Sequence, residues 1–282
     1  KKKKKPHLVA ERHDKITRAN GAYIANGAMR SLRAVYNHAR KSNRDLPAAN
    51  PTLAVDWNPE KRRNTGMGAR DLPGWLNELW SMPNLARREF HLLTLLTGSR
   101  PTALKSIRIE HIDFKARLLH IPKPKGGEDR AFDIPMSRPM MRCIARAIRI
   151  GRILYPEQAE FWLFPADSAN GHLVEHKEER DLLSKWGNDL RQSYRTIAQG
   201  LEVSTLDIHL LMNHSLLGTN AGYITRDKLL NDLLRRQQER ISRVVIEQAA
   251  RCADSQILHW LGSSQIDVPV AERDADDVKL AA

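Results

Sequence analysis

The 282-residue sequence lacks the features that mark several common classes of protein. Its two cysteines, Cys143 and Cys252, lie far apart with no C-x-x-C motif, which disfavours a disulfide framework and a cysteine-based zinc site. No apolar run approaches the ~18 residues of a membrane span, and no hydrophobic signal segment opens the chain. The G-x-x-x-x-G-K-[ST] and G-x-S-x-G motifs are also missing. We therefore expect a soluble intracellular protein that does not hydrolyse nucleoside triphosphates.

Positive charge is concentrated at the N-terminal end of the chain. Residues 1–66 contain 16 Lys and Arg but 5 Asp and Glu, a net of +11 within a total of +13. The segment from residue 248 onward has 3 basic and 6 acidic residues. A basic arm followed by an acidic tail is typical of a protein that binds a polyanion. This pattern favours a nucleic acid as the partner, with an acidic protein or a membrane surface as the alternatives.

Periodicity predicts a helical N-terminal domain. Apolar residues recur at helical spacing over residues 16–42, and Arg30, Arg33 and Arg40 lie outside that stripe, where we expect them to face solvent. The polar, basic segment that begins near Asn58 contains Pro and Gly and predicts a linker. The predicted organisation is a basic helical domain over 1–58, a linker over 59–70, a second domain over 71–247 and an acidic tail over 248–282.

The second domain is predicted to be mainly helical with a small antiparallel sheet, an α+β fold. A helix over 84–97 is stopped by Gly98, and Ser99 is expected to cap a short helix that starts at Pro101. Short alternating segments joined by a Gly-containing loop predict a β-hairpin. The hairpin segments are 117–122 and 130–135, a strand-like segment follows at 161–165, and further helices are expected at about 137–150, 176–199, 204–212 and 219–247.

A small set of residues has the chemistry that phosphodiester cleavage requires. Arginine suits a phosphate because its planar fork meets two oxygens at once. Arg100 lies beside a helix start, and Arg191 shares a helix face with Asn188, three residues earlier. His214 and Tyr223 follow, nine residues apart. Each of these residues alone is a weak indication of phosphodiester chemistry. Their order and spacing together favour it.

In this order the motifs resemble the tyrosine recombinase (phage integrase) family over about residues 15–247. The matching segments are Thr97-Gly98-Ser99-Arg100, Asp189-Leu190-Arg191, Leu211-Met212-Asn213-His214-Ser215 and Tyr223. The resemblance implies site-specific recombination of DNA, with Tyr223 attacking the scissile phosphate to form a 3′-phosphotyrosyl bond. It further implies that Arg100 and Arg191 stabilise the phosphate, that His214 hydrogen-bonds it, and that a hairpin lysine protonates the leaving 5′-oxygen.

Two features of the sequence leave the site incompletely defined. Asn188 stands where the family commonly has His, and a carboxamide cannot act as a base, so we expect Asn188 to bind phosphate by a hydrogen bond. Lys123 and Lys125 both lie at the predicted hairpin tip. Lys125 precedes a Gly-Gly pair as the family's lysine precedes its turn, so it is the preferred catalytic lysine and Lys123 is assigned to DNA binding.

The resemblance also implies partners and a location. The expected partner is double-stranded DNA carrying an attachment site, held by a homotetramer, with accessory DNA-bending proteins and no membrane, in the cytoplasm or nucleoid of a prokaryotic host. Residues predicted to hold DNA are Arg30, Arg33, Arg40, Lys61, Arg62, Arg63 and Lys123. No cofactor and no metal are expected. His172 and His176 have the spacing of two zinc ligands, but the sequence shows no evident third ligand.

Two other functions remain open from the sequence. One is a DNA-binding protein of the same fold with impaired cleavage, which Asn188 favours. The other is a resolvase or relaxing enzyme that applies the same chemistry to a single duplex.

Overall fold

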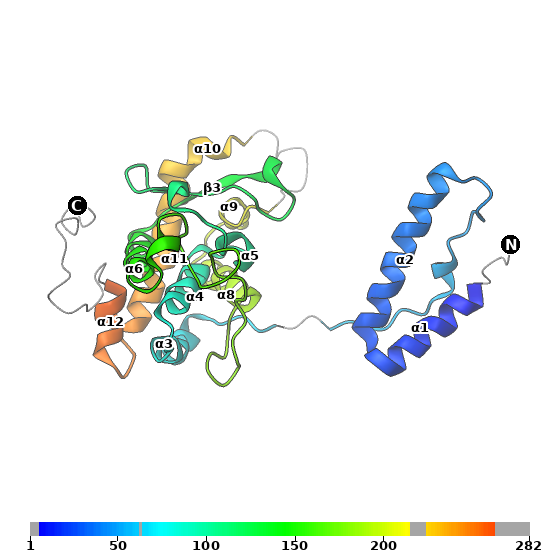
Figure 1. Cartoon of the computed structure of the whole chain (residues 1–282), viewed down its shortest axis with the longest axis horizontal. Helices are drawn as coiled ribbons and strands as arrows, with labels where there is room; N and C mark the ends of the chain where they lie inside the picture. Colours follow the sequence, from blue (N-terminus) through cyan, green and yellow to red (C-terminus); the bar gives the residue numbers. More distant parts are fainter. Residues whose placement is uncertain (1–5, 62–63, 215–223, 263–282) are drawn as a thin grey trace. The chain divides into compact units, whose positions relative to one another are not determined.

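A computed structural model describes residues 6–61, 64–214 and 224–262 of the chain (Figure 1). The chain divides into two compact units, Lys1–Arg63 and Asn64–Ala282. The helices are α1 (Pro6–Asn20), α2 (Ala22–Ser42), α3 (Leu72–Trp80), α4 (Leu85–Thr97), α5 (Pro101–Leu104), α6 (Arg138–Leu154), α7 (Pro156–Ala159), α8 (Asn188–Gly200), α9 (Thr205–Leu211), α10 (Arg226–Leu229), a π-helical turn (Leu230–Leu234), α11 (Arg235–Ala249) and α12 (Ser255–Gly262). The strands are β1 (Ile112–Asp113), β2 (Leu118–Ile121) and β3 (Phe132–Pro135).

The first unit is a helical hairpin with a small core. The single helix expected over 16–42 is instead divided, because Gly21 adopts a φ of 88° between α1 and α2. Glycine enters this region of φ without the steric cost that a Cβ imposes. Val9, Met29 and Val55 form the buried apolar cluster that joins the two helices to the segment that follows them.

The second unit contains the predicted small sheet. β1, β2 and β3 pair in that order, and both pairings are antiparallel. In the β2–β3 register Leu119 lies opposite Ile134, and both side chains are fully buried, so one face of the sheet joins the core. The described part of the chain is therefore mainly α with a small antiparallel sheet, which confirms the predicted fold class.

Helix α4 runs through the core of the second unit, packed against α6, α8 and α11. Asn84 caps its first turn by accepting a hydrogen bond from the Arg87 amide at 3.0 Å, and Gly98 ends it in a left-handed conformation. Both ends match the sequence prediction. The expected cap of the next helix differs, because Arg100 rather than Ser99 occupies that position.

A fully buried ion pair ties three helices together. Arg146 of α6 donates from Nε and Nη2 to the two carboxylate oxygens of Glu89 of α4, at 3.0 and 2.8 Å. Trp260 of α12 completes the cluster, because its indole Nε1 donates to Glu89 at 2.6 Å and its carbonyl accepts from Arg146 at 2.9 Å. Part of the segment expected as a tail from residue 248 is therefore packed in the core.

Of the other predicted elements, two helices agree with the structure, while one helix and one strand differ from it. Helices expected at 137–150 and 204–212 correspond to α6 and α9. The helix expected over 176–199 begins only at Asn188, because Gly187 precedes it with a φ of 62°. The segment 161–165 makes isolated bridges rather than a strand.

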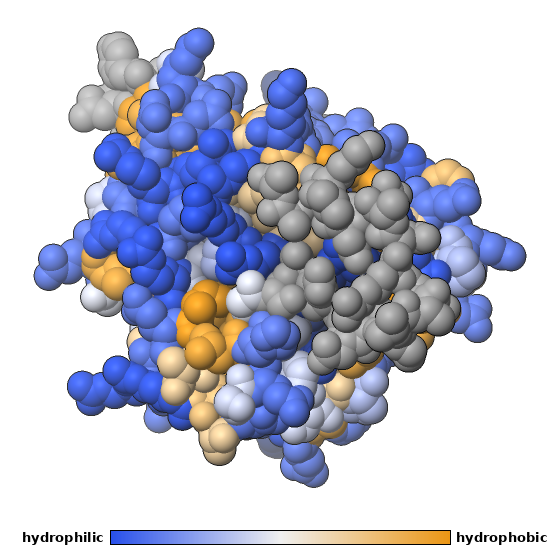
Figure 2. Space-filling model, turned by 90° about the vertical axis from the view of Figure 1, so that its left-hand side faces the viewer, coloured by the Kyte–Doolittle hydropathy of each residue, from blue (hydrophilic) through white to orange (hydrophobic). Residues whose placement is uncertain are grey.

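Figure 2 shows a face on which hydrophilic side chains surround small hydrophobic patches. Among the described helices, none has the length and apolar character needed to cross a lipid bilayer.

Replacing Arg146 by Met should lower the free energy of unfolding by about 3–5 kcal/mol, because it leaves the Glu89 carboxylate buried and unpaired. Urea denaturation measures the loss. The double replacement Glu89→Leu/Arg146→Met should recover most of it, since no buried charge then remains. Arg152→Met, at an exposed position of the same helix, is the control. An equal loss of unfolding free energy in the single and double variants would contradict the buried ion pair between Glu89 and Arg146.

Candidate active site

The guanidinium of Arg191 joins three segments that are far apart in the sequence. Arg191 lies on the first turn of α8 and donates from Nη1 to the carbonyl of Gly98, at the end of α4. Its Nη2 donates to the carbonyl of Met212 at 3.0 Å and also contacts Nε2 of His214. The structure thus brings together three of the motifs singled out in the sequence.

The turn that follows α4 is shaped by close packing. A Cβ at Gly98 would collide with the ring of Tyr194, and the φ of 60° is itself unfavourable for other residues. Oγ1 of Thr97 accepts a hydrogen bond from the Ser99 amide at 3.2 Å. Arg100 follows in extended conformation and is half-buried, at the start of α5.

Tyr194 itself is a core residue. Its side chain is 1% exposed, its hydroxyl donates to Gln238 at 2.9 Å, and burial raises the pKa of its phenol.

The segment before His214 turns through a left-handed residue. Asn213 has a φ of 49°, which asparagine tolerates better than most residues with a side chain. The His214 amide donates to the carbonyl of His209 at 2.9 Å, which fixes the backbone beside Arg191.

The site holds concentrated positive charge. Burial, and then the charge of Arg100, lower the pKa of Arg191 to about 10. Burial, followed by the charges of Arg191 and other neighbours including Arg100, lowers the pKa of His214 to about 4, so this imidazole is neutral at pH 7. The hydrogen-bond partners of Arg191 among the described residues are two carbonyls and a neutral ring, none of them a carboxylate. The arrangement is suited to bind an anion.

Two further side chains belong to this cluster, and the sequence analysis did not name them. Arg195 is one helical turn beyond Arg191, and its charge contributes to the low pKa of both Arg191 and His214. The ring of His209 lies 5.4 Å from that of His214. The i, i+4 spacing of the two arginines was the available signal for Arg195.

Asn188 is the exposed first residue of α8. It lies one turn before Arg191, at the end of the helix where free amide groups and the helix dipole favour an anion. This placement is compatible with the predicted hydrogen bond to a phosphate oxygen, which stays a prediction.

The hairpin tip distinguishes the two candidate lysines. Lys123 forms an ion pair with Glu128 at 2.7 Å, whereas Lys125 is exposed and forms no ion pair with the described residues. Gly126 and Gly127 follow with φ values of 118° and 93°, which allow the chain to turn back. An unpaired ammonium is the better proton donor to a substrate, so the preference for Lys125 is kept.

Tyr223 lies outside the described residues, and so do Arg62 and Arg63. The chain that follows Tyr223 is fixed by Arg226, which the sequence analysis also missed. Arg226 donates from Nε to the carbonyl of Leu210 at 3.1 Å and from Nη2 to the carbonyl of Asp133, and it lies over the ring of Phe132 at 5.3 Å. No local pattern distinguishes such an arginine from a solvated one.

In the first unit, two of the arginines predicted to hold DNA have intramolecular partners. Arg30 pairs with Glu60 at 2.7 Å, and Arg40 donates to the carbonyl of Ala48 at 2.6 Å. Arg33 and Lys61 are exposed. The described residues contain no group of three or more His, Cys, Asp or Glu side chains that could hold a metal ion.

The fold is mainly helical, and arginine and histidine side chains gather at the junction of α4, α8 and α9. No family model matches the chain. Over 251 residues the chain is 25% identical to the prophage integrase IntF of Escherichia coli (strain K12), covering 82% of this chain and 51% of that protein. The chain thus spans about half the length of this relative. This similarity supports the resemblance to the tyrosine recombinase (phage integrase) family that the ordered motifs indicate.

A solved structure, the integrase from mycobacterium phage Brujita, is similar over 87% of this chain and 81% of its own. The sequence identity is 14% and the TM-score is 0.42.

His214 should titrate near pH 4, well below the ordinary histidine value of ~6.5, when its ring proton is followed by NMR. The unfolded chain binds this proton more readily, so stability from His214 is present above about pH 6.5 and is lost as the pH falls toward 4. Arg191→Met should raise the pKa, because it removes a neighbouring positive charge, while Arg152→Met should not. A wild-type midpoint near the ordinary value would refute the geometry.

Asn213→Val should lower the free energy of unfolding by about 1–2 kcal/mol, because a β-branched residue pays the full cost of the left-handed conformation. Asn213→Gly loses the same side chain but should be tolerated. Thermal unfolding compares the two, with Gln199→Val on the exposed face of α8 as the control. Equal stability of the Gly and Val variants would argue against this backbone.

Proposed function

We propose that this chain is a site-specific DNA recombinase that cuts and rejoins DNA strands through a 3′-phosphotyrosyl intermediate. The observation that carries the proposal is the position of Arg191, bound between the Gly98 turn and the Met212–His214 segment and close enough to Arg100 for their charges to interact. Two guanidinium groups with no carboxylate among their described partners favour a doubly coordinated oxyanion. The similarity to a prophage integrase supports the same proposed function.

In the proposed reaction the phenolic oxygen of Tyr223 attacks the scissile phosphorus and the bond to the 5′-oxygen breaks. Lys125 donates its proton to that leaving oxygen. Attack by a 5′-hydroxyl of the partner strand reverses both steps, so the bond energy is conserved in the covalent ester and no nucleoside triphosphate is consumed. Arg100 and Arg191 stabilise the charge that develops on the non-bridging oxygens, and such electrostatic stabilisation is usually the largest catalytic contribution.

Neutral His214 and exposed Asn188 complete the phosphate site by hydrogen bonding. His214 contacts Arg191 through Nε2, so a phosphate oxygen bound by Arg191 is also near this ring. Because Asn188 cannot accept the tyrosine proton, the phenol of Tyr223, whose ordinary pKa is ~10, loses its proton to solvent water, and the positive field of the arginines stabilises the phenolate.

The basic first unit would hold the duplex, and exchange between two duplexes requires four protomers. Phosphate contacts from Arg33 and Lys61, both exposed, supply affinity and salt dependence without sequence choice. The name of the relative, a prophage integrase, favours a mobile element as the substrate, with integration or excision as the reaction.

A second candidate function is DNA binding with impaired cleavage. The observation that favours it is Asn188, an exposed carboxamide at the position where the family commonly has an imidazole. The two functions share the phosphate site and differ in whether a covalent bond forms.

Incubation with a nicked suicide duplex that carries the attachment site, in EDTA, should give a covalent protein–DNA adduct on a denaturing gel. Tyr223→Phe should abolish the adduct, and Tyr155→Phe, a tyrosine outside the site, should retain it. Arg191→Met should slow its formation by roughly 10²–10³-fold, the usual effect of losing one oxyanion-stabilising group.

The control for binding is the same duplex without a nick, retained on a native gel. Binding by the wild type with no adduct would exclude strand cleavage and favour the second function. Asn188→His would then be expected to restore the adduct, because it supplies a base.

A further inference from the structure

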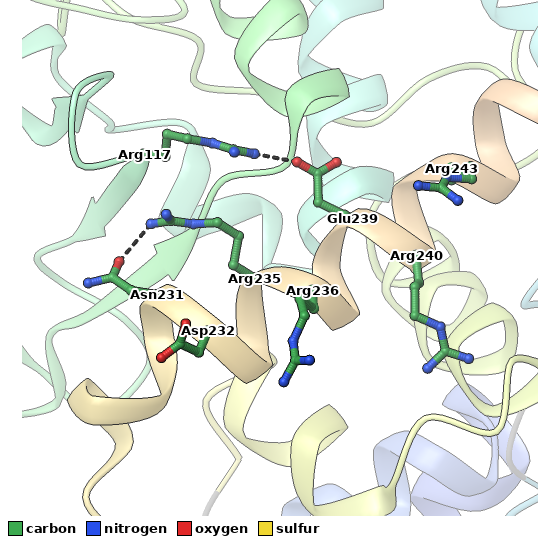
Figure 3. A pocket seen from close by; sticks show the side chains of 8 residues that line it. All are labelled: Arg117, Asn231, Asp232, Arg235, Arg236, Glu239, Arg240 and Arg243. Carbon is green, nitrogen blue, oxygen red and sulfur yellow. Dashed lines mark hydrogen bonds and ion pairs between the residues drawn. The ribbon is translucent and has the colours of Figure 1, made fainter.

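A second positive surface lies along α11, outside the proposed active site. A groove of about 430 Å³ is lined by five arginines, two acidic residues and an asparagine (Figure 3). The arginines are Arg117, Arg235, Arg236, Arg240 and Arg243. We refer to these five residues as the α11 arginine groove.

The acidic residues do not neutralise the groove. Glu239 accepts hydrogen bonds from Arg117 and, at 3.0 Å, from the backbone amide of Arg138, so its carboxylate is engaged at one side of the groove. Asp232 makes no ion pair with any described residue within 4.0 Å. Five guanidinium groups against two carboxylates leave a formal excess of three positive charges.

Three of the arginines form an exposed stripe. Arg236, Arg240 and Arg243 are four and three residues apart, so they share one face of α11. Figure 3 shows the side chains of Arg236 and Arg240 extending from the helix on the side away from Glu239. The acceptors of Arg240 are neutral, namely Gln237 at 2.7 Å and the carbonyl of Leu201 at 2.9 Å, so its charge is held in place but not compensated.

Two other arginines are fixed beside this stripe. Arg235 donates to the carbonyl of Ala116 at 2.6 Å and to Asn231 at 2.7 Å, and Arg117 donates to the carbonyl of Met136 at 3.0 Å. The Nε atoms of Arg117 and Arg235 are both buried without a hydrogen-bond partner among the described residues. Burial, and then the charge of Arg117, lower the pKa of Arg235.

The groove is separate from the predicted catalytic residues. Arg117 immediately precedes β2, whereas Lys125 follows the other end of that strand, at the hairpin tip. Arg100, Arg191 and His214 are also not among the residues that line the groove, so an anion bound there is held by a different set of side chains.

We propose that the α11 arginine groove binds the phosphodiester backbone of a DNA segment outside the cleavage site. All eight lining residues are charged or amide-bearing, and none is apolar or aromatic. A protein partner is usually held by an apolar and aromatic interface core, which this groove does not offer, whereas contacts to phosphates need only cations. The inference rests on the proposed recombinase function, in which more than one stretch of DNA must be held at once.

The test compares the full chain with the triple variant Arg236→Gln/Arg240→Gln/Arg243→Gln. The charge-matched control is Arg152→Gln/Lys177→Gln/Arg251→Gln, three exposed cations elsewhere in the second unit. Affinity for a long duplex is measured between about 50 and 200 mM salt, because each phosphate contact contributes roughly one to the slope of log affinity against log salt. Thermal unfolding establishes that both variants are folded.

In the stripe variant the slope of log affinity against log salt should be smaller in magnitude than in the wild type by about three. In the control variant it should be smaller by less than one. Both should form the covalent adduct on a short nicked duplex at the wild-type rate, because the cleavage site is intact. An unchanged slope in the stripe variant would overturn the inference while a normal adduct leaves the recombinase function standing. Loss of binding to polyglutamate with an unchanged slope would also overturn it, in favour of an acidic protein partner. An absent adduct in the wild type would count against the recombinase function itself.

Discussion

The hydrogen bonds between the Arg191 guanidinium and the carbonyls of Gly98 and Met212 are the interaction on which the site depends. They connect the start of α8 to the end of α4 and to the segment after α9. Gly98 is 93 residues from Arg191 in the sequence, and Met212 is 21 residues from it. Because both acceptors are neutral, the guanidinium is oriented without losing its charge. Burial and then that charge lower the pKa of His214 and keep its ring neutral, and together they prepare the site for an anion.

The contrast with Arg146 shows how one residue type serves two purposes. Arg146 is fully buried, and Glu89 accepts two of its hydrogen bonds, so its charge is compensated and contributes to the core. Arg191 and the stripe of the α11 arginine groove have neutral acceptors or no ion-pair partner among the described residues. Arg146 and Arg191 therefore differ in whether a carboxylate compensates the charge of the guanidinium.

Local signals in the sequence were sufficient for some elements and insufficient for others. The ends of α4 were predicted because Asn84 and Gly98 act on their own neighbours. The break at Gly21 and the late start of α8 were missed, because apolar spacing continues across both positions. Arg100 and Arg191 were recognised through ordered motifs, while Arg226 was missed because its acceptors, Leu210 and Asp133, are 16 and 93 residues away.

The most direct test of the central claim is a crystal structure of the Tyr223→Phe variant bound to an uncleaved duplex that carries the attachment site. We predict that the scissile phosphate lies within hydrogen-bond distance of both Arg100 and Arg191, with His214 on a third side and Arg191 still bound to Gly98 and Met212. A scissile phosphate bound elsewhere, with Arg100 and Arg191 contacting no DNA, would contradict it.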